Sequence, residues 1–191
     1  MTQETTTRQS ASHQSASQQP ASRQPASRDA PANPPAYVAG PAHELVLDRV
    51  LDAPRAALWR CWTEPELLKQ WFCPKPWFVS DVRMDLRVGG EFFALMNGPD
   101  GEQFGEPGVF LEVVDGERLV FTDALRPGWV PSGRAFMVAE VGFEDAGPGK
   151  TRYVARARHW SAEAKKEHEE MGFHEGWNQA ADQLVELARS L

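Results

Sequence analysis

The segment from His168 to His174 is the part of this sequence that most resembles a metal-binding helix. Its two histidines are six residues apart, so on a helix they lie on different faces. A zinc helix of the metalloprotease type needs histidines at positions i and i+4 to bring both rings to one metal. The fourth residue after His168 is Gly172. The spacing therefore predicts two histidines at the surface or rim of the protein, and no metal site.

Cys61 and Cys73 are the two cysteines of the chain. Neither has an adjacent histidine to activate it as a nucleophile. Two cysteines in apolar segments also do not make the disulfide framework of a secreted protein. We therefore expect two reduced, buried thiols, as is typical of a cytoplasmic protein.

Two polar side chains share one face of the last predicted strand, residues 151–160. Along this strand three arginines alternate with Tyr153, two alanines and His159. The arginine face should meet water, which directs Tyr153 and His159 inward. A few polar groups in an apolar hollow are typical of a small-molecule site. They are equally consistent with hydrogen-bonded core or rim residues, and the sequence leaves both interpretations open.

The elements that position these residues begin with a strand at residues 44–51. Pro54 then fits the first turn of a helix that places Leu58, Trp59 and Trp62 on one face. Thr63 and Glu66 have the spacing of a capping box, which predicts a second short helix ending before Pro74.

From Trp77 onward the apolar residues alternate with period two, which predicts strands. Turn sequences rich in glycine separate strands at residues 78–86, 91–96, 108–114, 118–123, 136–144 and 151–160. Ser161 is a good N-cap for a closing helical region, and Gly172 predicts a break within it. Strands in the middle with helices at both ends indicate an α+β fold with a curved antiparallel sheet of about six or seven strands around a long C-terminal helix.

Residues 1–42 differ in composition from the rest of the chain. The pentad Gln-(Ser/Pro)-Ala-Ser-x begins at Gln9, Gln14, Gln19 and Gln24, and large apolar residues are nearly absent. Such a segment cannot bury enough surface to offset its ordering entropy. We therefore expect a disordered Gln/Ser/Ala/Pro-rich tail at 1–42 and a single folded domain at 43–191.

The composition argues against two classes of partner. The chain carries 20 Lys and Arg against 27 Asp and Glu, a net charge of −7. An acidic protein with scattered basic residues is poorly suited to the phosphate backbone of a nucleic acid. No apolar run approaches the roughly 20 residues of a membrane span, so no membrane partner is expected.

Several motifs resemble one known family. They are Leu51-Asp-Ala-Pro-Arg55, Trp62-Thr-Glu-Pro-Glu-Leu-Leu-Lys-Gln-Trp71, Met84-Asp-Leu-Arg-Val-Gly-Gly90, Glu117-Arg-Leu-Val-Phe-Thr122 and Met171-Gly-Phe-His-Glu-Gly-Trp177. In this order they resemble the homologues of the heat-shock protein 90 ATPase activator, over residues 44–191. That family belongs to the START/Bet v 1-like (SRPBCC) superfamily. The resemblance implies a helix-grip fold with a deep hydrophobic cavity and no shared catalytic motif. We expect no cofactor.

The leading functional hypothesis is a non-catalytic binder of a small hydrophobic or aromatic molecule, held between the inner sheet face and the closing helix. The expected ligand-cavity residues are Phe78, Val82, Met84, Met137, Val141, Tyr153, His159, Phe173, Trp177, Ala181 and Leu184.

Two alternatives belong to other classes of protein. In the first, a cyclase or hydrolase would use His159, with Tyr153, as general acid and base. In the second, Trp129 and its loop would bind a chaperone or a regulator. The identity of the ligand and the oligomeric state stay open.

Overall fold

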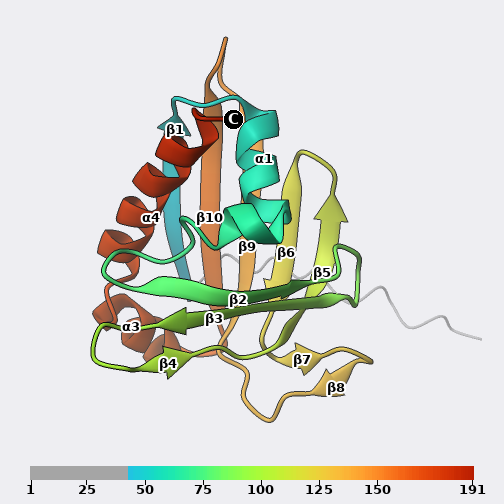
Figure 1. The fold of residues 1–191 in the computed structure, drawn as a ribbon. Helices are drawn as coiled ribbons and strands as arrows, with labels where there is room; N and C mark the ends of the chain where they lie inside the picture. Colours follow the sequence, from blue (N-terminus) through green and yellow to red (C-terminus); the bar gives the residue numbers. More distant parts are fainter. Residues whose placement is uncertain (1–42) are drawn as a thin grey trace, which may run out of the picture. The chain divides into compact units, whose positions relative to one another are not determined.

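The structure of the chain, a computed structural model, describes residues 43–191, drawn in colour in Figure 1. The expected disorder of residues 1–42 concerns a segment outside the described residues. The helices and strands are β1 (Glu44–Leu51), α1 (Arg55–Thr63), α2 (Pro65–Leu68), β2 (Phe78–Met84), β3 (Glu91–Asn97), β4 (Gln103–Phe104), β5 (Gly108–Val114), β6 (Arg118–Thr122), β7 (Leu125–Arg126), β8 (Val130–Pro131), β9 (Met137–Asp145), β10 (Thr151–His159), α3 (Ala162–Glu170) and α4 (Phe173–Ala188).

One curled antiparallel sheet dominates the domain. Its seven main strands run in the order β1-β10-β9-β6-β5-β3-β2, and β4 adds to β3. Figure 1 shows β2 and β3 crossing in front of β9 and β10, with α1 and α4 on the concave side. The α+β helix-grip fold predicted from the sequence is confirmed, including the two short helices after the first strand.

Strand β2 departs from the simple alternation expected of it. A β-bulge shifts the pairing with β3 between Val79 and Asp81. The extra residue places Val79 and Val82 together on the buried side, while Phe78 is 56% exposed. Bulges re-aim side chains in this way because two residues then oppose one on the partner strand. The expectation that Phe78 faces the interior is therefore wrong.

Helix α2 begins without the capping box predicted for it. The Thr63 hydroxyl donates to the Trp59 carbonyl, 2.8 Å away, instead of accepting from the Glu66 amide. Thr63 is the last residue of α1, so its hydroxyl bonds to a carbonyl of the preceding turn of that helix. Glu64 is the N-cap of α2, with no side-chain hydrogen bond.

The predicted start and break of the closing helical region are both confirmed. The Ser161 hydroxyl accepts from the Ala164 amide at the start of α3. Gly172, with φ of +91°, separates α3 from α4 in a left-handed conformation that favours glycine. No residue of the polar helix α3 is fully buried, whereas α4 buries one face that includes Phe173, Ala181 and Leu184.

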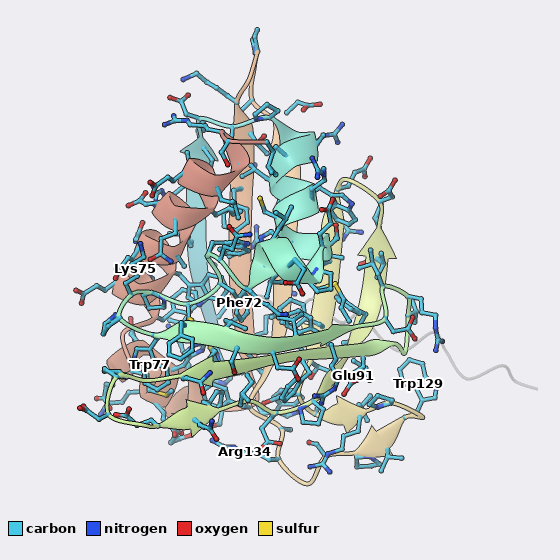
Figure 2. The ribbon with its side chains drawn as sticks, in the orientation of Figure 1. Phe72, Lys75, Trp77, Glu91, Trp129 and Arg134 are labelled. Carbon is cyan, nitrogen blue, oxygen red and sulfur yellow. The ribbon has the colours of Figure 1, made fainter. Side chains whose placement is uncertain are left out.

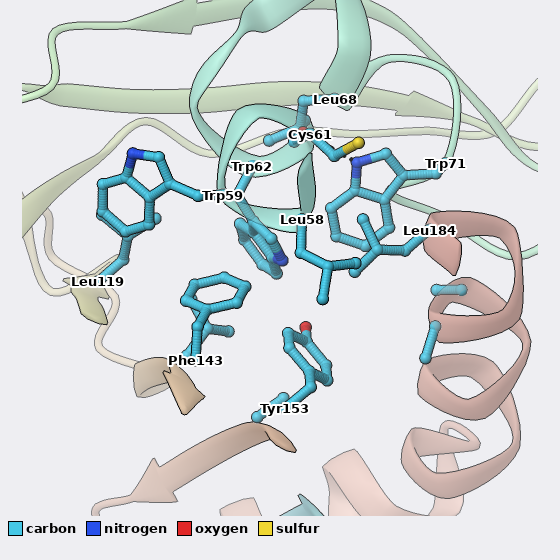
Figure 3. Close-up of a cluster of buried hydrophobic side chains, with 14 of the residues drawn as sticks. Leu58, Trp59, Cys61, Trp62, Leu68, Trp71, Leu119, Phe143, Tyr153 and Leu184 are labelled. Atoms are coloured by element: carbon cyan, nitrogen blue, oxygen red, sulfur yellow. Dashed lines mark hydrogen bonds between the residues drawn. The ribbon is translucent and has the colours of Figure 1, made fainter. Parts of the chain in front are cut away.

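Aromatic rings fill most of the space between the helices and the sheet. Trp62 contacts Trp71, Phe72 and Phe121 at ring distances of 4.9, 5.6 and 6.2 Å. The indole N–H of Trp71 donates to the Cys61 carbonyl at 2.9 Å, as the dashed line in Figure 3 marks. The contacts of Trp62 with Trp71 and Phe72 are edge-to-face contacts, which stabilise aromatic cores beyond their buried area. They also leave little empty volume.

Candidate ligand cavity

A small cavity lies between the inner face of the sheet and α4. Its volume is about 10 Å³, roughly the minimum that accommodates one water molecule. The residues around it are Phe121, Met137, Ala139, Glu140, Val141, Ala155, Arg156, Ala157, Phe173 and Trp177. The deep cavity implied by the family resemblance is thus almost filled, because large aromatic side chains occupy the interior.

The structure separates the predicted cavity residues into three groups. Those that border the cavity are Met137, Val141, Phe173 and Trp177. Those that lie in the surrounding core are Val82, Met84, Tyr153, Ala181 and Leu184. Outside both groups, Phe78 is exposed and His159 lies near the end of the sheet.

Phe121 of β6 is a cavity residue that the sequence interpretation did not include. Its strand was expected, but which of its faces is buried was not assigned. The pairing of β6 with β9 would have assigned this face, because Phe121 lies opposite Ala139 of β9. Ala139 borders the cavity, and residues directly opposite in an antiparallel pair share a face.

Two histidines form a hydrogen-bonded pair where β10 meets α3. Nε2 of His159 lies 2.9 Å from Nδ1 of His168, and Nδ1 of His159 lies 3.1 Å from the His43 carbonyl. A carbonyl only accepts, so Nδ1 of His159 carries the proton toward it. In neutral His159, Nε2 is then the acceptor for a proton on Nδ1 of His168.

The environment of His168 favours its neutral form. Its ring lies among Phe136, His159 and Phe173, with centroids 5.1 Å away in each case. Burial, assisted by the neighbouring His159, lowers the pKa of His168 to about 4. His168 is thus a partly buried residue at the rim, hydrogen-bonded to His159, and its ring anchors α3 to the end of the sheet.

His174 lies apart from this pair, as the sequence spacing predicted. It is on α4, beyond the break at Gly172, and its Nε2 is 3.9 Å from the Glu169 carboxylate. Among residues 43–191, no three His, Cys, Asp or Glu side chains come together as metal ligands. The two cysteines are free and buried, and burial raises the pKa of each to about 11, so neither is an activated nucleophile.

Tyr153 and Trp62 place two polar atoms in the apolar interior. Both side chains are fully buried, and neither the Tyr153 hydroxyl nor the Trp62 Nε1 has a regular hydrogen-bond partner among the described residues. Burial raises the pKa of the Tyr153 hydroxyl far above its usual range, and the Trp62 indole N–H lowers it slightly. The two groups are therefore neighbours, and Figure 3 shows the Tyr153 hydroxyl directed toward Trp62 and Leu58.

A larger groove of about 590 Å³ lies at the surface between β1 and α4. Among the described residues, most of its charged side chains, though not Glu186, are paired with one another. Arg49 contacts Asp182 and Lys150 contacts Asp52, each at 2.7 Å. A groove lined by satisfied ion pairs does not offer the apolar surface that a hydrophobic ligand needs. In the part of the chain that the structure describes, no helix has the length and apolar character needed to cross a membrane.

Comparison with known proteins identifies a family and several solved relatives. The family described as activator of Hsp90 ATPase homolog 1-like protein matches residues 52–189. A crystal structure from Nitrosomonas europaea is 48% identical, with a TM-score of 0.74 over 77% of this chain and 94% of that one.

Two further structures are more distant. A protein from Mycobacterium smegmatis is 26% identical, with a TM-score of 0.64 over 76% of this chain and 90% of its own. An AHSA1-like protein from Aeromonas hydrophila, 20% identical with a TM-score of 0.58 over 77% and 92% of the two chains, shares the fold. No curated protein matches the chain.

Proposed function

Because the chain belongs to the family of activator of Hsp90 ATPase homolog 1-like proteins, we propose that it binds a small hydrophobic or aromatic ligand between α4 and the inner face of the sheet. The ligand occupies and widens the cavity bordered by Ala157, Phe173 and Trp177. Binding, and not turnover, is the proposed activity.

The small side chains that face α4 are the observation that carries this proposal. Ala139, Ala155 and Ala157 form a shallow strip on β9 and β10, directly opposite Phe173 and Trp177. Trp177 is only partly buried, unlike Trp62 and Trp71 in the core. A ligand that displaces the Trp177 ring gains an apolar surface, and small-molecule sites are lined mostly by apolar side chains.

The test is to fill the cavity without touching any polar group. Ala157→Val adds two methyl groups to the cavity wall. Ala188→Val makes the same change at an equally buried alanine of α4 that does not border the cavity. Binding of fluorene, a flat aromatic hydrocarbon, is followed by the change in tryptophan emission.

We expect Ala157→Val to weaken fluorene binding at least tenfold and Ala188→Val to leave it within about twofold of wild type. Equal loss in both variants would mean that general overpacking, which costs about 1–3 kcal/mol at either site, is responsible. Binding that survives Ala157→Val unchanged would place the ligand elsewhere.

The enzyme alternative is less well supported by the geometry around His159. Both of its ring nitrogens have partners, the His43 carbonyl and His168. A general base needs a free nitrogen within reach of the proton it removes. The hydrogen bonds of His159 therefore favour a structural role over catalysis. Release of product from ester or polyketide-like substrates, lost in His159→Gln, would reverse this conclusion.

An interaction with a protein partner is the second candidate function, and Trp129 favours it. Its side chain is 53% exposed, and Figure 2 shows it projecting beside the β7–β8 hairpin. Its backbone has φ of +63°, a costly conformation for a bulky residue. Gly89 makes room for the ring, since a Cβ there would lie 2.9 Å from it.

The chaperone named by the family is the partner to test first. Purified heat-shock protein 90 from the same host is assayed for ATPase rate with the wild-type domain and with Trp129→Ser. Stimulation that the variant lacks would support this second function, and an unchanged rate with both proteins would dismiss it.

The free thiols of Cys61 and Cys73 support the further proposal that the protein works in the cytoplasm.

A further inference from the structure

We propose that the Tyr153 hydroxyl and the Trp62 indole N–H form a polar subsite that recognises a neutral carbonyl oxygen of the bound ligand. This inference rests on the proposed ligand-binding function and narrows the class of ligand. The preferred compounds are ketones, aldehydes, esters or amides with a flat apolar body.

Trp62 and Tyr153 together have more hydrogen-bond donors than acceptors, so they cannot satisfy each other. The indole contributes one donor, and the hydroxyl contributes one donor and an acceptor oxygen. Even if Trp62 donates to the Tyr153 oxygen, the hydroxyl proton is left without an acceptor among residues 43–191. A buried donor without a partner costs free energy, and a ligand oxygen placed between the two groups would accept from both.

Other polar groups of the interior already have partners. The indole N–H of Trp71 donates to the Cys61 carbonyl at 2.9 Å, and the Thr151 hydroxyl donates to the Ala53 carbonyl at 2.8 Å. Buried atoms without a regular hydrogen bond also occur in His43 and Glu44 at the start of β1, but Glu44 Oε1 has ion pairs with Arg156 and Arg158 at 3.5 and 3.3 Å. The Tyr153 hydroxyl and the Trp62 indole N–H therefore differ from these groups, because they lack a regular hydrogen-bond partner among the described residues and lie in the hydrophobic core.

The subsite adjoins the cavity through one side chain on each wall. On β10, Tyr153 is the inward-facing residue next to Ala155, which borders the cavity. On the helical side, the rings of Trp62 and Trp177 are nearly parallel, at 9°, with centroids 6.3 Å apart. Trp177 borders the cavity and is the movable wall of the proposed site. In the proposed site, the ligand displaces this ring to reach the two donors.

The chemistry of the two donors selects neutral acceptors. Burial keeps the Tyr153 hydroxyl protonated by raising its pKa, so the hydroxyl is a donor throughout the physiological range. The buried polar or charged side chains among residues 43–191 are Thr122, Thr151 and His159, none of them a lysine or arginine. Arg156 at the cavity border is already paired with Glu44 and Glu140, so a carboxylate moved beside Tyr153 would lose its hydration without a free counter-charge. A carbonyl oxygen loses less on burial and gains two hydrogen bonds.

The test compares 9-fluorenone with fluorene, which share a flat tricyclic skeleton and differ by a carbonyl in place of a methylene. Affinities are measured by calorimetry for wild type, Tyr153→Phe and Trp71→Phe. Tyr153→Phe keeps the ring and removes the hydroxyl. Trp71→Phe removes an indole whose N–H is already satisfied, so it controls for general loss of aromatic packing.

We expect Tyr153→Phe to weaken fluorenone binding about tenfold, equivalent to about 1.4 kcal/mol, while fluorene affinity changes less than about twofold. Trp71→Phe should not alter the ratio of the two affinities. As a second measurement, the carbonyl stretch of bound fluorenone should shift to lower frequency in wild type and return toward its value in hydrocarbon solvent in Tyr153→Phe.

An unchanged fluorenone affinity and carbonyl frequency in Tyr153→Phe would overturn the polar subsite while leaving apolar ligand binding intact. Failure of wild type to bind either compound would instead overturn the proposed function, and the subsite with it.

Discussion

Nε2 of His159 and Nδ1 of His168 lie 2.9 Å apart, so a strand and a helix are joined by a pair of imidazole rings. The arrangement requires one nitrogen to donate and the other to accept. Adding a proton to each ring would leave two donors facing each other and two like charges in contact. The contact between α3 and the end of β10 is therefore sensitive to pH.

Acidification should destabilise the fold through His168. Its pKa in the folded protein is about 4, against an ordinary value of 6.5, so the unfolded chain takes up the proton more readily. The stabilising contribution is complete above about pH 6.5 and is lost as the pH falls toward 4. We expect a loss of about 2 kcal/mol over that range, after allowing for partial exposure.

Denaturant titrations at several pH values, with His168→Phe beside wild type, measure this effect. Phenylalanine retains contacts with Phe136 and Phe173 and cannot be protonated, so the variant should show a flatter pH profile between 6.5 and 4. His174→Gln, a change at an exposed histidine, should keep the wild-type profile. A wild-type slope in His168→Phe would assign the pH dependence to another group.

His159→Gln should cost about 1–2 kcal/mol of stability. His159 is 7% exposed and has two hydrogen-bond partners, and a glutamine amide cannot reproduce both imidazole contacts. Fluorene affinity should stay within about twofold, since His159 does not border the cavity. Urea unfolding beside a binding titration separates the two effects. Normal stability with lost binding would contradict the structural role.

Trp177→Ala should cost about 3 kcal/mol, at the low end for removing a buried tryptophan because the residue is only partly buried. The void left beside Ala157 should accept indole, and saturating indole should restore part of the lost stability by mass action. The thermal midpoint is measured with and without indole. Trp160→Ala, a change at an exposed tryptophan, should neither lower the thermal midpoint nor make it depend on indole. No indole effect on Trp177→Ala would mean that the void collapses.

Deleting residues 1–42 should leave the thermal midpoint and the circular dichroism of the folded domain unchanged within about one degree. This expectation follows from the pentad repeat and the scarcity of large apolar side chains in that segment. A loss of several degrees would show that the segment packs on the domain.

Much of the fold was predictable from the sequence because the signals were local. Ser161 identified the start of α3, Gly172 identified the break before α4, and the arginine alternation along β10 assigned its two faces correctly. Each signal depends on residues within one or two turns of the chain.

The candidate site was less predictable, since it depends on tertiary contacts. The bulge after Val79 exposed Phe78 although the period-two pattern continued through it. His168 pairs with His159 only because α3 folds back on the end of β10, and no spacing in the sequence encodes that contact. The filling of the cavity depends on how Trp62, Phe72 and Trp177 pack against one another.

Methyl NMR during a titration with fluorene tests the central claim most directly. Met137 and Ala157 border the cavity, whereas Met171 is exposed and Ala188 is buried elsewhere in α4. Ligand binding between sheet and helix should shift the methyl signals of Met137 and Ala157 in a saturable manner and leave Met171 and Ala188 in place. Shifts confined to Met171, or no saturable shift in any methyl signal, would contradict a ligand site in the interior.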